Sequence, residues 1–174
     1  MILSDLNLAR RLERAEAHAS SRFVEARARM SSDSGAGWME VAGAFAMFDG
    51  PKSPITQTFG LGMFEEATPA DLDRLEKFFR ERGAPVMHEI SPIAHKSLFT
   101  MLNGRGYQPI EFTSVMFLPL DAPTQVAPPA NANIRVRAIE EGDSEVWADT
   151  AAEGWRESIE FADLILDLAR VAAA

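Results

Sequence analysis

Segments patterned like strands and segments patterned like helices alternate along the middle of the chain. Hydrophobic periodicity and turn residues predict the order strand, strand, helix, strand, helix, strand, over residues 38–48, 53–63, 68–82, 84–90, 95–105 and 107–118. Alternation of this kind is typical of α/β folds, in which helices cover the faces of a sheet. The sequence therefore predicts an α/β domain, which we place at residues 1–120.

The clearest signal for an element boundary is the sequence Thr68-Pro69-Ala70-Asp71. Thr68 can cap a helix, Pro69 suits its first position, and Asp71 places an acid three residues after the cap. The helix that follows is predicted to bury Leu72, Leu75, Phe78 and Phe79. The next predicted helix carries a stripe of Leu98, Phe99, Met101 and Leu102.

A long helix is predicted ahead of the sheet, over residues 4–30. Apolar residues recur there at steps of three and four and would line one face: Leu8, Leu12, Ala15, Ala19, Phe23, Ala26 and Met30. Ser4 is predicted to cap the helix by accepting a hydrogen bond from the amide of Asn7. The charged residues of the helix, Glu13 and Glu16 among them, are interpreted as a solvated face.

The first two predicted strands are separated by a turn sequence, Asp49-Gly50-Pro51. Each of the segments 38–48 and 53–63 is expected to be one strand. We expect the two strands to form a hairpin whose loop carries Lys52.

Residues 121–133 are rich in Pro, Ala and Asn without hydrophobic periodicity, which is typical of an interdomain linker. Beyond the linker, residues 134–139 alternate apolar residues with Arg as a strand does, and residues 143–153 and 158–171 have helical periodicity. Residues 134–174 are too few to form an independent core. We expect this part to pack on the first domain or on another chain.

Charge and composition argue against several classes of function. Seventeen basic residues against 26 acidic ones give a net charge of −9, which repels phosphate backbones and anionic membrane surfaces. We therefore predict that neither nucleic acid nor a membrane is a partner. The chain has no Cys, which excludes thiolate nucleophiles and disulfides. Without an apolar run of roughly 18 to 20 residues or a signal-peptide pattern, a cytoplasmic location is expected.

Two stretches of the chain resemble the GNAT fold of N-acetyltransferases. Residues 134–155, IRVRAIEEGDSEVWADTAAEGW, are similar to the opening strand and helix of a GNAT domain, and residues 38–120, ending in FTSVMFLPL, are similar to its later two-thirds. The resemblance implies a tandem-repeat chain in which a mixed sheet flanked by helices is followed by only the first strand and helices of a second repeat. It also implies acyl transfer from acetyl-CoA to a small-molecule primary amine.

The resemblance places Gly60, Leu61, Gly62 and Met63 on the central strand, where acetyl-CoA would bind as cosubstrate. The family holds the pyrophosphate on the amides of a Gln/Arg-x-x-Gly-x-Gly/Ala loop, whereas the corresponding loop here, residues 64–68, reads FEEAT. Its two carboxylates would repel a pyrophosphate. We therefore expect weak or absent acetyl-CoA binding, a degenerate first repeat and a chain that is inactive alone.

The resemblance also locates the acid that protonates the departing thiolate. The family's catalytic Tyr would fall at Leu102, counted back from the pair Gly106-Tyr107, and leucine has no proton to donate. Tyr107 is therefore left with two interpretations, as a replacement acid or as a structural aromatic residue.

The residues that could act as a general base are carboxylates and one imidazole: Glu40, His88, Glu89 and Glu111. His88 and Glu89 are neighbours on a predicted strand, so they should point to opposite faces of the sheet. No metal site is predicted, because His88 and His95 supply only two imidazoles without a matching ligand spacing.

Three functions stay open at this stage. The chain is either an acetyl-CoA-dependent N-acetyltransferase by family, or a non-catalytic GNAT-like scaffold that shapes the substrate cleft of an active repeat. The third alternative is a structural or ligand-sensing homodimer, joined through the sheet edge that the absent strands leave bare.

Overall fold

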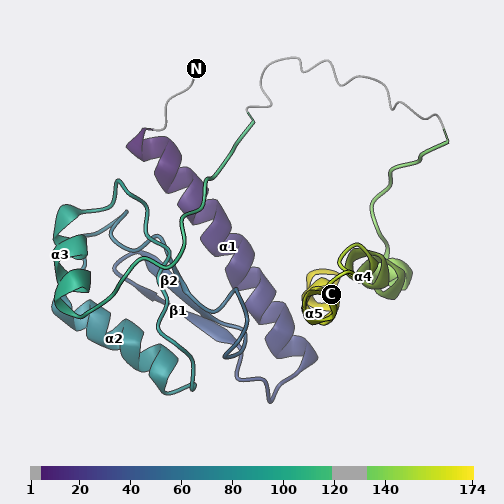
Figure 1. Ribbon diagram of the computed structural model, residues 1–174, viewed down its shortest axis with the longest axis horizontal. Helices are drawn as coiled ribbons and strands as arrows, with labels where there is room; N and C mark the ends of the chain where they lie inside the picture. The colour runs from purple at the N-terminus through teal and green to yellow at the C-terminus, as the bar shows by residue number, and fades with distance from the viewer. Residues whose placement is uncertain (1–4, 119–132) are drawn as a thin grey trace.

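The computed structural model describes residues 5–118 and 133–174. Within these residues the chain is a mixed α/β structure with a three-stranded antiparallel sheet and five α-helices (Figure 1). The elements are α1 (Leu6–Met30), β1 (Gly37–Val41), β2 (Ala44–Phe48), β3 (Thr58–Phe59), α2 (Pro69–Arg80), α3 (Lys96–Gly104), the 3-10 helix η1 (Glu141–Asp143), α4 (Ser144–Glu153) and α5 (Ile159–Ala172). The predicted α/β class and the long first helix are confirmed, while the finer GNAT-like architecture stays a prediction.

The segment 38–48 is a hairpin in itself. β1 and β2 pair antiparallel from Gly37 opposite Phe48 to Val41 opposite Ala44. Ala42 and Gly43, which join them, both have positive φ angles, 50° and 74°, as the central residues of a tight type I′ turn do. The prediction of one continuous strand is therefore wrong, because Ala42 adopts a positive φ that alanine rarely takes.

β3 borders β2 on one side and a short parallel segment on the other. β2 and β3 pair antiparallel, and the loop between them carries Lys52 as predicted. On the other side, the Thr58 amide donates to the Met87 carbonyl at 3.0 Å and the Glu89 amide donates to the Thr58 carbonyl at 2.9 Å. These bonds form a single parallel bridge between Thr58 and His88, so the predicted strand 84–90 is reduced to this contact.

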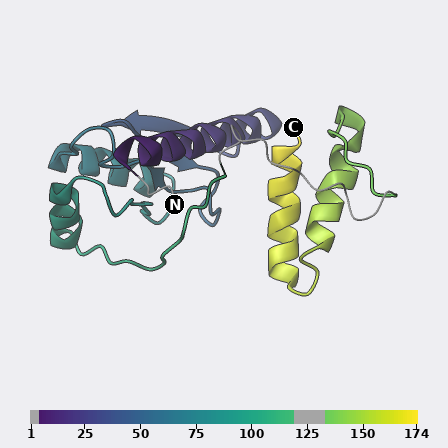
Figure 2. The same cartoon turned by 90° about the horizontal axis from the view of Figure 1, so that it is seen from above.

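The two faces of the sheet carry separate apolar cores. On one face, α1 packs Ala17 and Val24 against Phe45, Met47 and Phe59. The other face packs against α2 and α3 through a larger core that includes Ala46, Phe48, Leu61, Leu72, Phe79 and Leu98. Figure 2 shows α1 running along the sheet and α2 and α3 at the same end of the molecule. The sheet is therefore the middle layer of three.

α1 begins one residue later than predicted and buries a different face. Asp5 caps the helix by accepting from the Leu8 amide at 2.7 Å, and the expected cap Ser4 lies outside the described residues. The buried residues are small: Ala9, Ala17, Ser20, Ser21, Val24 and Ala26. The predicted stripe is therefore largely wrong, and Ala15, Ala19 and Met30 are exposed, because the residues that let a helix approach a sheet closely are small rather than long.

α2 matches its prediction closely. Thr68 accepts from the Asp71 amide at 3.2 Å and the Asp71 carboxylate accepts from the Thr68 amide at 3.0 Å, which makes a complete capping box. The predicted stripe is buried throughout: Leu72, Leu75, Phe78 and Phe79. In α3, Leu98 and Leu102 are buried, whereas Phe99 is exposed.

The predicted strands 107–118 and 134–139 do not form. Both segments lack sheet pairing, and most of their large apolar side chains are exposed. A strand gains its hydrogen bonds and its buried face only from a neighbour, so a strand-like pattern does not suffice where no neighbour is present.

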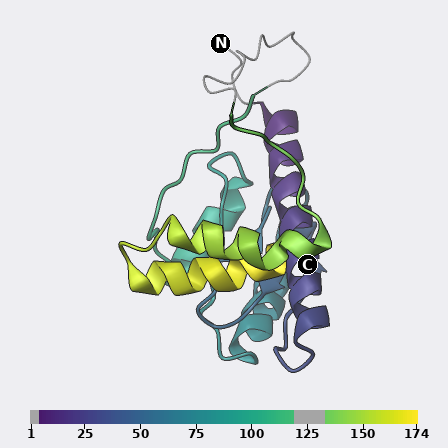
Figure 3. The same ribbon diagram turned by 90° about the vertical axis from the view of Figure 1, so that its right-hand side faces the viewer.

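α4 and α5 form a helical hairpin in which the two helices lie side by side (Figure 3), and the hairpin lies beside the domain (Figure 2). Arg27 of α1 donates to Asp49 at 2.8 Å through Nε and to Asp167 of α5 at 2.7 Å through Nη1. The C-terminal part thus contacts the first domain, which is one of the two packing partners expected from its small size. No helix among the described residues combines the length and the apolarity needed to cross a bilayer.

Candidate functional site

His88 occupies the face of its strand that is turned toward α2 and α3. Its Nδ1 lies 3.1 Å from the Thr58 hydroxyl, and its ring centroid lies 5.1 Å from that of Tyr107. The Nε2 atom is buried without a hydrogen-bond partner. Burial lowers the pKa of His88 to about 4, so the imidazole is neutral at neutral pH.

Glu76 of α2 joins Tyr107 to two arginines. The Tyr107 hydroxyl donates to Glu76 Oε1 at 3.3 Å, Arg105 donates to the same oxygen at 2.9 Å, and Arg80 lies 2.9 Å from Oε2. Burial acts to raise the pKa of Glu76, but the bond and charge of Arg105 outweigh it, so this pKa lies below its usual value. Burial and the Glu76 charge raise the pKa of Tyr107 to about 12. We call Thr58, Glu76, His88 and Tyr107 the histidine face.

A pocket of about 420 Å³ opens beside the histidine face, and it is lined by Glu76, Arg80, Val86, Arg105, Gly106 and Tyr107. Its charged groups already pair with one another. Arg105 also lies 2.7 Å from Asp73 and donates to the Pro69 carbonyl at 2.9 Å. The Arg105 guanidinium is therefore bound by groups of the protein itself, and the two arginines of the pocket are matched by two carboxylates, Glu76 in the lining and Asp73 outside it.

The opposite face of the same strand gathers carboxylates, and we call Glu13, Glu16 and Glu89 the carboxylate face. The pKa of Glu13 is raised to about 7, first by burial and then by the charges of Glu89 and Glu16, while a hydrogen bond from the Gly60 amide acts to lower it. The pKa of Glu89 is also raised, first by burial and then by Glu16 and Glu111. Gln57 donates to the Glu89 carboxylate at 3.4 Å. A cationic ligand would relieve this repulsion.

The carboxylate face lies where β3 and the parallel segment end. After Phe59 the chain turns at Gly60, whose φ is 76°, and so leaves the segment that continues through Glu89. α1 covers the turn, because Arg10 donates from Nε to the Met63 carbonyl at 2.6 Å and Arg14 lies 4.0 Å from the ring centroid of Phe64. In open α/β sheets, ligands bind at the carboxyl ends of parallel strands.

The four residues predicted to lie against acetyl-CoA, Gly60, Leu61, Gly62 and Met63, are all buried inside this turn. A Cβ on Gly60 would come 2.9 Å from the Phe64 ring, and one on Gly62 would come 2.8 Å from Leu98. The Met63 amide donates to the Gly60 carbonyl at 3.1 Å, and the His95 amide donates to the Gly62 carbonyl at 3.0 Å. In this arrangement the two glycines permit close packing within the protein.

The acidic loop that follows, residues 64–68, makes a contact within the protein. Glu66 accepts from the Ser97 hydroxyl at 2.6 Å, while Glu65 is exposed. At the start of α2 the Asp71 carboxylate already supplies the negative charge that the helix dipole favours. An incoming diphosphate would compete with this side chain for the same position.

The remaining predicted residues lie apart from one another. Glu40 is exposed on β1, opposite Phe45, at the far edge of the sheet. Glu111 is exposed beyond Tyr107 and is close enough to Glu89 to raise its pKa. The structure thus places His88 beside Tyr107, puts Glu111 toward the carboxylate face, and leaves Glu40 distant from both.

Sequence reasoning missed Glu13 and Glu76, which are the acids most strongly integrated into these two faces. Each shares a helix face with buried residues, since Glu76 follows Leu72 by four positions and Glu13 lies four positions from both Ala9 and Ala17. A carboxylate in the buried register of a helix is the signal that could have identified them.

Comparisons with protein-family models, with curated proteins and with solved structures find no match to this chain. Among the residues that the structure describes, no group of three or more His, Asp or Glu side chains is arranged to hold a metal ion.

Proposed function

We propose that the protein is a GNAT-type N-acyltransferase domain that receives a small primary amine at its carboxylate face. One observation carries the proposal. Glu13 lies at the carboxyl end of the parallel bridge, where burial and the charge of Glu89 raise its pKa and the Gly60 amide acts to lower it. This is the end of a strand pair at which open α/β sheets bind ligands.

The chemistry of an amine acceptor suits this face. An alkylammonium has a pKa near that of a lysine side chain, about 10.4, and must lose a proton before its nitrogen can attack. A carboxylate whose pKa is about 7 accepts protons near neutral pH far better than one with an ordinary pKa. Glu89 and Glu16 add the negative charge that would hold the ammonium in place.

In the proposed reaction the first ammonium proton passes to Glu13. The nitrogen lone pair then attacks the thioester carbonyl of acetyl-CoA, the new C–N bond forms, the C–S bond breaks, and the second nitrogen proton goes to the departing thiolate. Tyr107 is not the donor in this scheme, because it lies with His88 on the other face of the strand.

The residues that would bind acetyl-CoA are poorly suited to it, and we propose that the chain is inactive alone. The Gly60 amide is bonded to Glu13, the Met63 amide is bonded within the turn, and Asp71 occupies the start of α2. Glu65 and Glu66 add negative charge beside that position. These contacts favour the amine and disfavour a polyanionic nucleotide.

Calorimetry with two separate ligands tests the proposal, with 1,4-diaminobutane as the amine probe and acetyl-CoA as the cosubstrate. We expect the diamine to bind above the pKa of Glu13 and acetyl-CoA to give no heat at millimolar concentration. Glu89→Gln should weaken diamine binding about five- to tenfold, since one charge contact is worth roughly 1 kcal/mol.

Glu40→Gln is the matched control, because it removes an exposed carboxylate at the far edge of the sheet and should leave the diamine affinity unchanged. Equal affinities for Glu89→Gln and Glu40→Gln would refute an amine site at this face. Tight acetyl-CoA binding with release of free CoA would instead show that the chain is catalytically complete.

A further inference from the structure

The segment 110–118 exposes more apolar surface than any other stretch of its length in the described chain. Phe112 is 90% exposed and Met116 is 93% exposed, and four other large apolar residues of the segment are also exposed: Ile110, Val115, Phe117 and Leu118. Ile110, Phe112, Met116 and Leu118 all stand at even positions, so in an extended segment they share one face. An exposed apolar face of this kind on one segment marks an interaction site.

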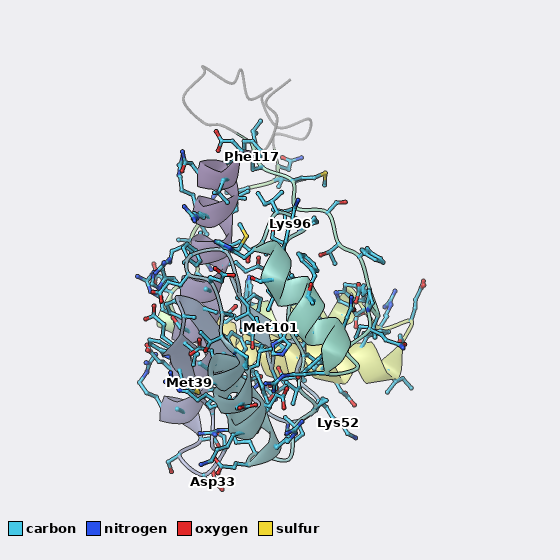
Figure 4. All side chains as sticks on the ribbon, turned by 90° about the vertical axis from the view of Figure 1, so that its left-hand side faces the viewer. Asp33, Met39, Lys52, Lys96, Met101 and Phe117 are labelled. Carbon is cyan, nitrogen blue, oxygen red and sulfur yellow. The ribbon has the colours of Figure 1, made fainter. Side chains whose placement is uncertain are left out.

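The sheet of the same chain does not offer this segment a matching edge. The exposed edge at β1 is only Gly37–Val41, and the other edge consists of the single bridged residue His88. Phe117 lies at the end of the molecule opposite Asp33 (Figure 4). Among the described residues, neither edge of the sheet is long enough to pair with the whole segment.

The order of residues in the segment fits pairing with itself. In an antiparallel arrangement centred on Ser114, Ile110 lies opposite Leu118 and Phe112 lies opposite Met116. The inner pair is Thr113 with Val115, two β-branched residues that favour strands.

We propose that two copies of this chain associate through antiparallel pairing of residues 110–118 about a two-fold axis at Ser114. A two-fold interface requires a self-complementary patch, and this segment meets the requirement on its apolar face. Its one charged residue, Glu111, falls opposite Phe117, so no like charges meet across the pair.

The charge of the chain predicts how the dimer responds to salt. Each copy carries a net charge of −9, so two copies repel one another at a distance. Added salt screens this repulsion and leaves apolar contacts in place. The dimer should therefore tighten as ionic strength rises, in contrast to an association held by ion pairs.

Cysteine crosslinking tests the register, because the natural chain has no Cys. Ser114→Cys should form a disulfide-linked dimer under mild oxidation, since residue 114 faces its own copy. A mixture of Phe112→Cys and Met116→Cys should form the mixed dimer, whereas Phe112→Cys alone should not, because its two copies would be separated by about 13 Å.

Hydrogen-bonded and non-hydrogen-bonded pairs alternate along an antiparallel ladder, so the pair of residues 113 and 115 differs in kind from the pair of residues 112 and 116. A mixture of Thr113→Cys and Val115→Cys therefore tests the same register at a pair of the other kind. Lys52→Cys, on an exposed loop, is the control for random collision and should form no disulfide-linked dimer. Equal crosslinking at every position, Lys52→Cys included, would overturn the proposed register.

Sedimentation of the unmodified chain provides the second measurement. We expect a monomer–dimer equilibrium that Phe112→Asp shifts to monomer and that Ile159→Asp, which changes an apolar residue that is 77% exposed on α5, leaves in place. A chain that stays monomeric at high concentration and high salt overturns the proposal. So does pairing of 110–118 with residues 134–139 of the same chain, seen as a monomer with protected amides in both segments.

Discussion

The histidine face and the carboxylate face lie back to back on one short strand and treat charge in opposite ways. On the histidine face a buried carboxylate, Glu76, is matched by two arginines and a tyrosine hydroxyl, and the imidazole of His88 is neutral. On the carboxylate face, the charges of Glu16 and Glu89 raise the pKa of Glu13, and Glu16 also raises the pKa of Glu89. Within residues 5–118 and 133–174, the Gly60 amide acts on Glu13 and Gln57 donates to Glu89.

The difference separates a structural role from a chemical one. A buried charge with complete partners holds elements together, and here it fastens α2 to the chain beyond α3. Carboxylates gathered without a compensating cation cost stability, and such strain is common where a ligand binds. The two faces should therefore respond differently to mutation and to pH.

The largest expected effect is the loss of Glu76. Glu76→Ala removes the hydrogen bonds that Arg105 and the Tyr107 hydroxyl donate to Glu76 and the ion pair with Arg80. Because a hydrogen bond to a charged group is worth about 1.5–3 kcal/mol, the total loss should be about 3–5 kcal/mol. The free energy of unfolding in urea measures the effect. Asp73→Ala is the control, because it removes an exposed carboxylate bound to the same Arg105 and should cost less than about 1 kcal/mol. Equal losses of unfolding free energy in the two variants would show that Glu76 stabilises the fold no more than the exposed Asp73 does.

The next effect is the acid sensitivity due to His88. Its pKa is about 4 in the fold against 6.5 when unfolded, so between these values the unfolded chain binds more protons and stability falls as the pH drops. The full loss is about 3 kcal/mol. Urea unfolding across this range should show that His88→Asn flattens the slope, and the comparison is best made in a Glu13→Gln background. An unchanged slope would mean that His88 is protonated in the fold without penalty.

Glu13 should give the opposite trend. Its pKa is about 7 in the fold against 4.5 when unfolded, so the folded chain holds the proton more tightly and stability falls as the pH rises between these values. Discounted for its partial exposure, the effect is about 1–2 kcal/mol. Glu13→Gln should therefore stabilise the protein above pH ~7 and change little below pH ~5. A destabilisation above neutral pH would mean that the Gly60 hydrogen bond outweighs the repulsion.

The smallest effect sharpens the separation of the two faces. Tyr107→Phe removes one hydroxyl bond to Glu76 at 3.3 Å and should cost about 0.5–1.5 kcal/mol in unfolding measurements. Its diamine affinity should equal that of the unmodified protein, since Tyr107 does not reach the carboxylate face. A change in diamine affinity larger than twofold would connect the two faces and contradict the assignment.

The sequence predicted helices better than strands for a physical reason. The α2 cap and its buried stripe depend on residues within one or two turns, which a local pattern contains. Strand pairing depends on distant partners, so 107–118 and 134–139 carry the right pattern without forming a sheet. The hairpin at Ala42 was hidden because alanine rarely takes a positive φ.

The candidate site was predictable only in part. The expectation that His88 and Glu89 point apart is confirmed, since His88 bonds to Thr58 and Glu89 to Gln57 on the other face. Glu13 could not be joined to Glu89 from sequence, because α1 and the parallel segment are brought together only by the packing of α1 on the sheet.

Arg27 links the domain to the C-terminal hairpin, because its guanidinium donates to Asp49 through Nε and to Asp167 through Nη1. Asp49 is almost completely buried, whereas the side chain of Asp167 is 56% exposed. Dissolved ions can therefore weaken the Arg27–Asp167 ion pair more than the Arg27–Asp49 ion pair. The molecule should accordingly tumble as one body in dilute buffer, and its two parts should reorient more independently in concentrated salt.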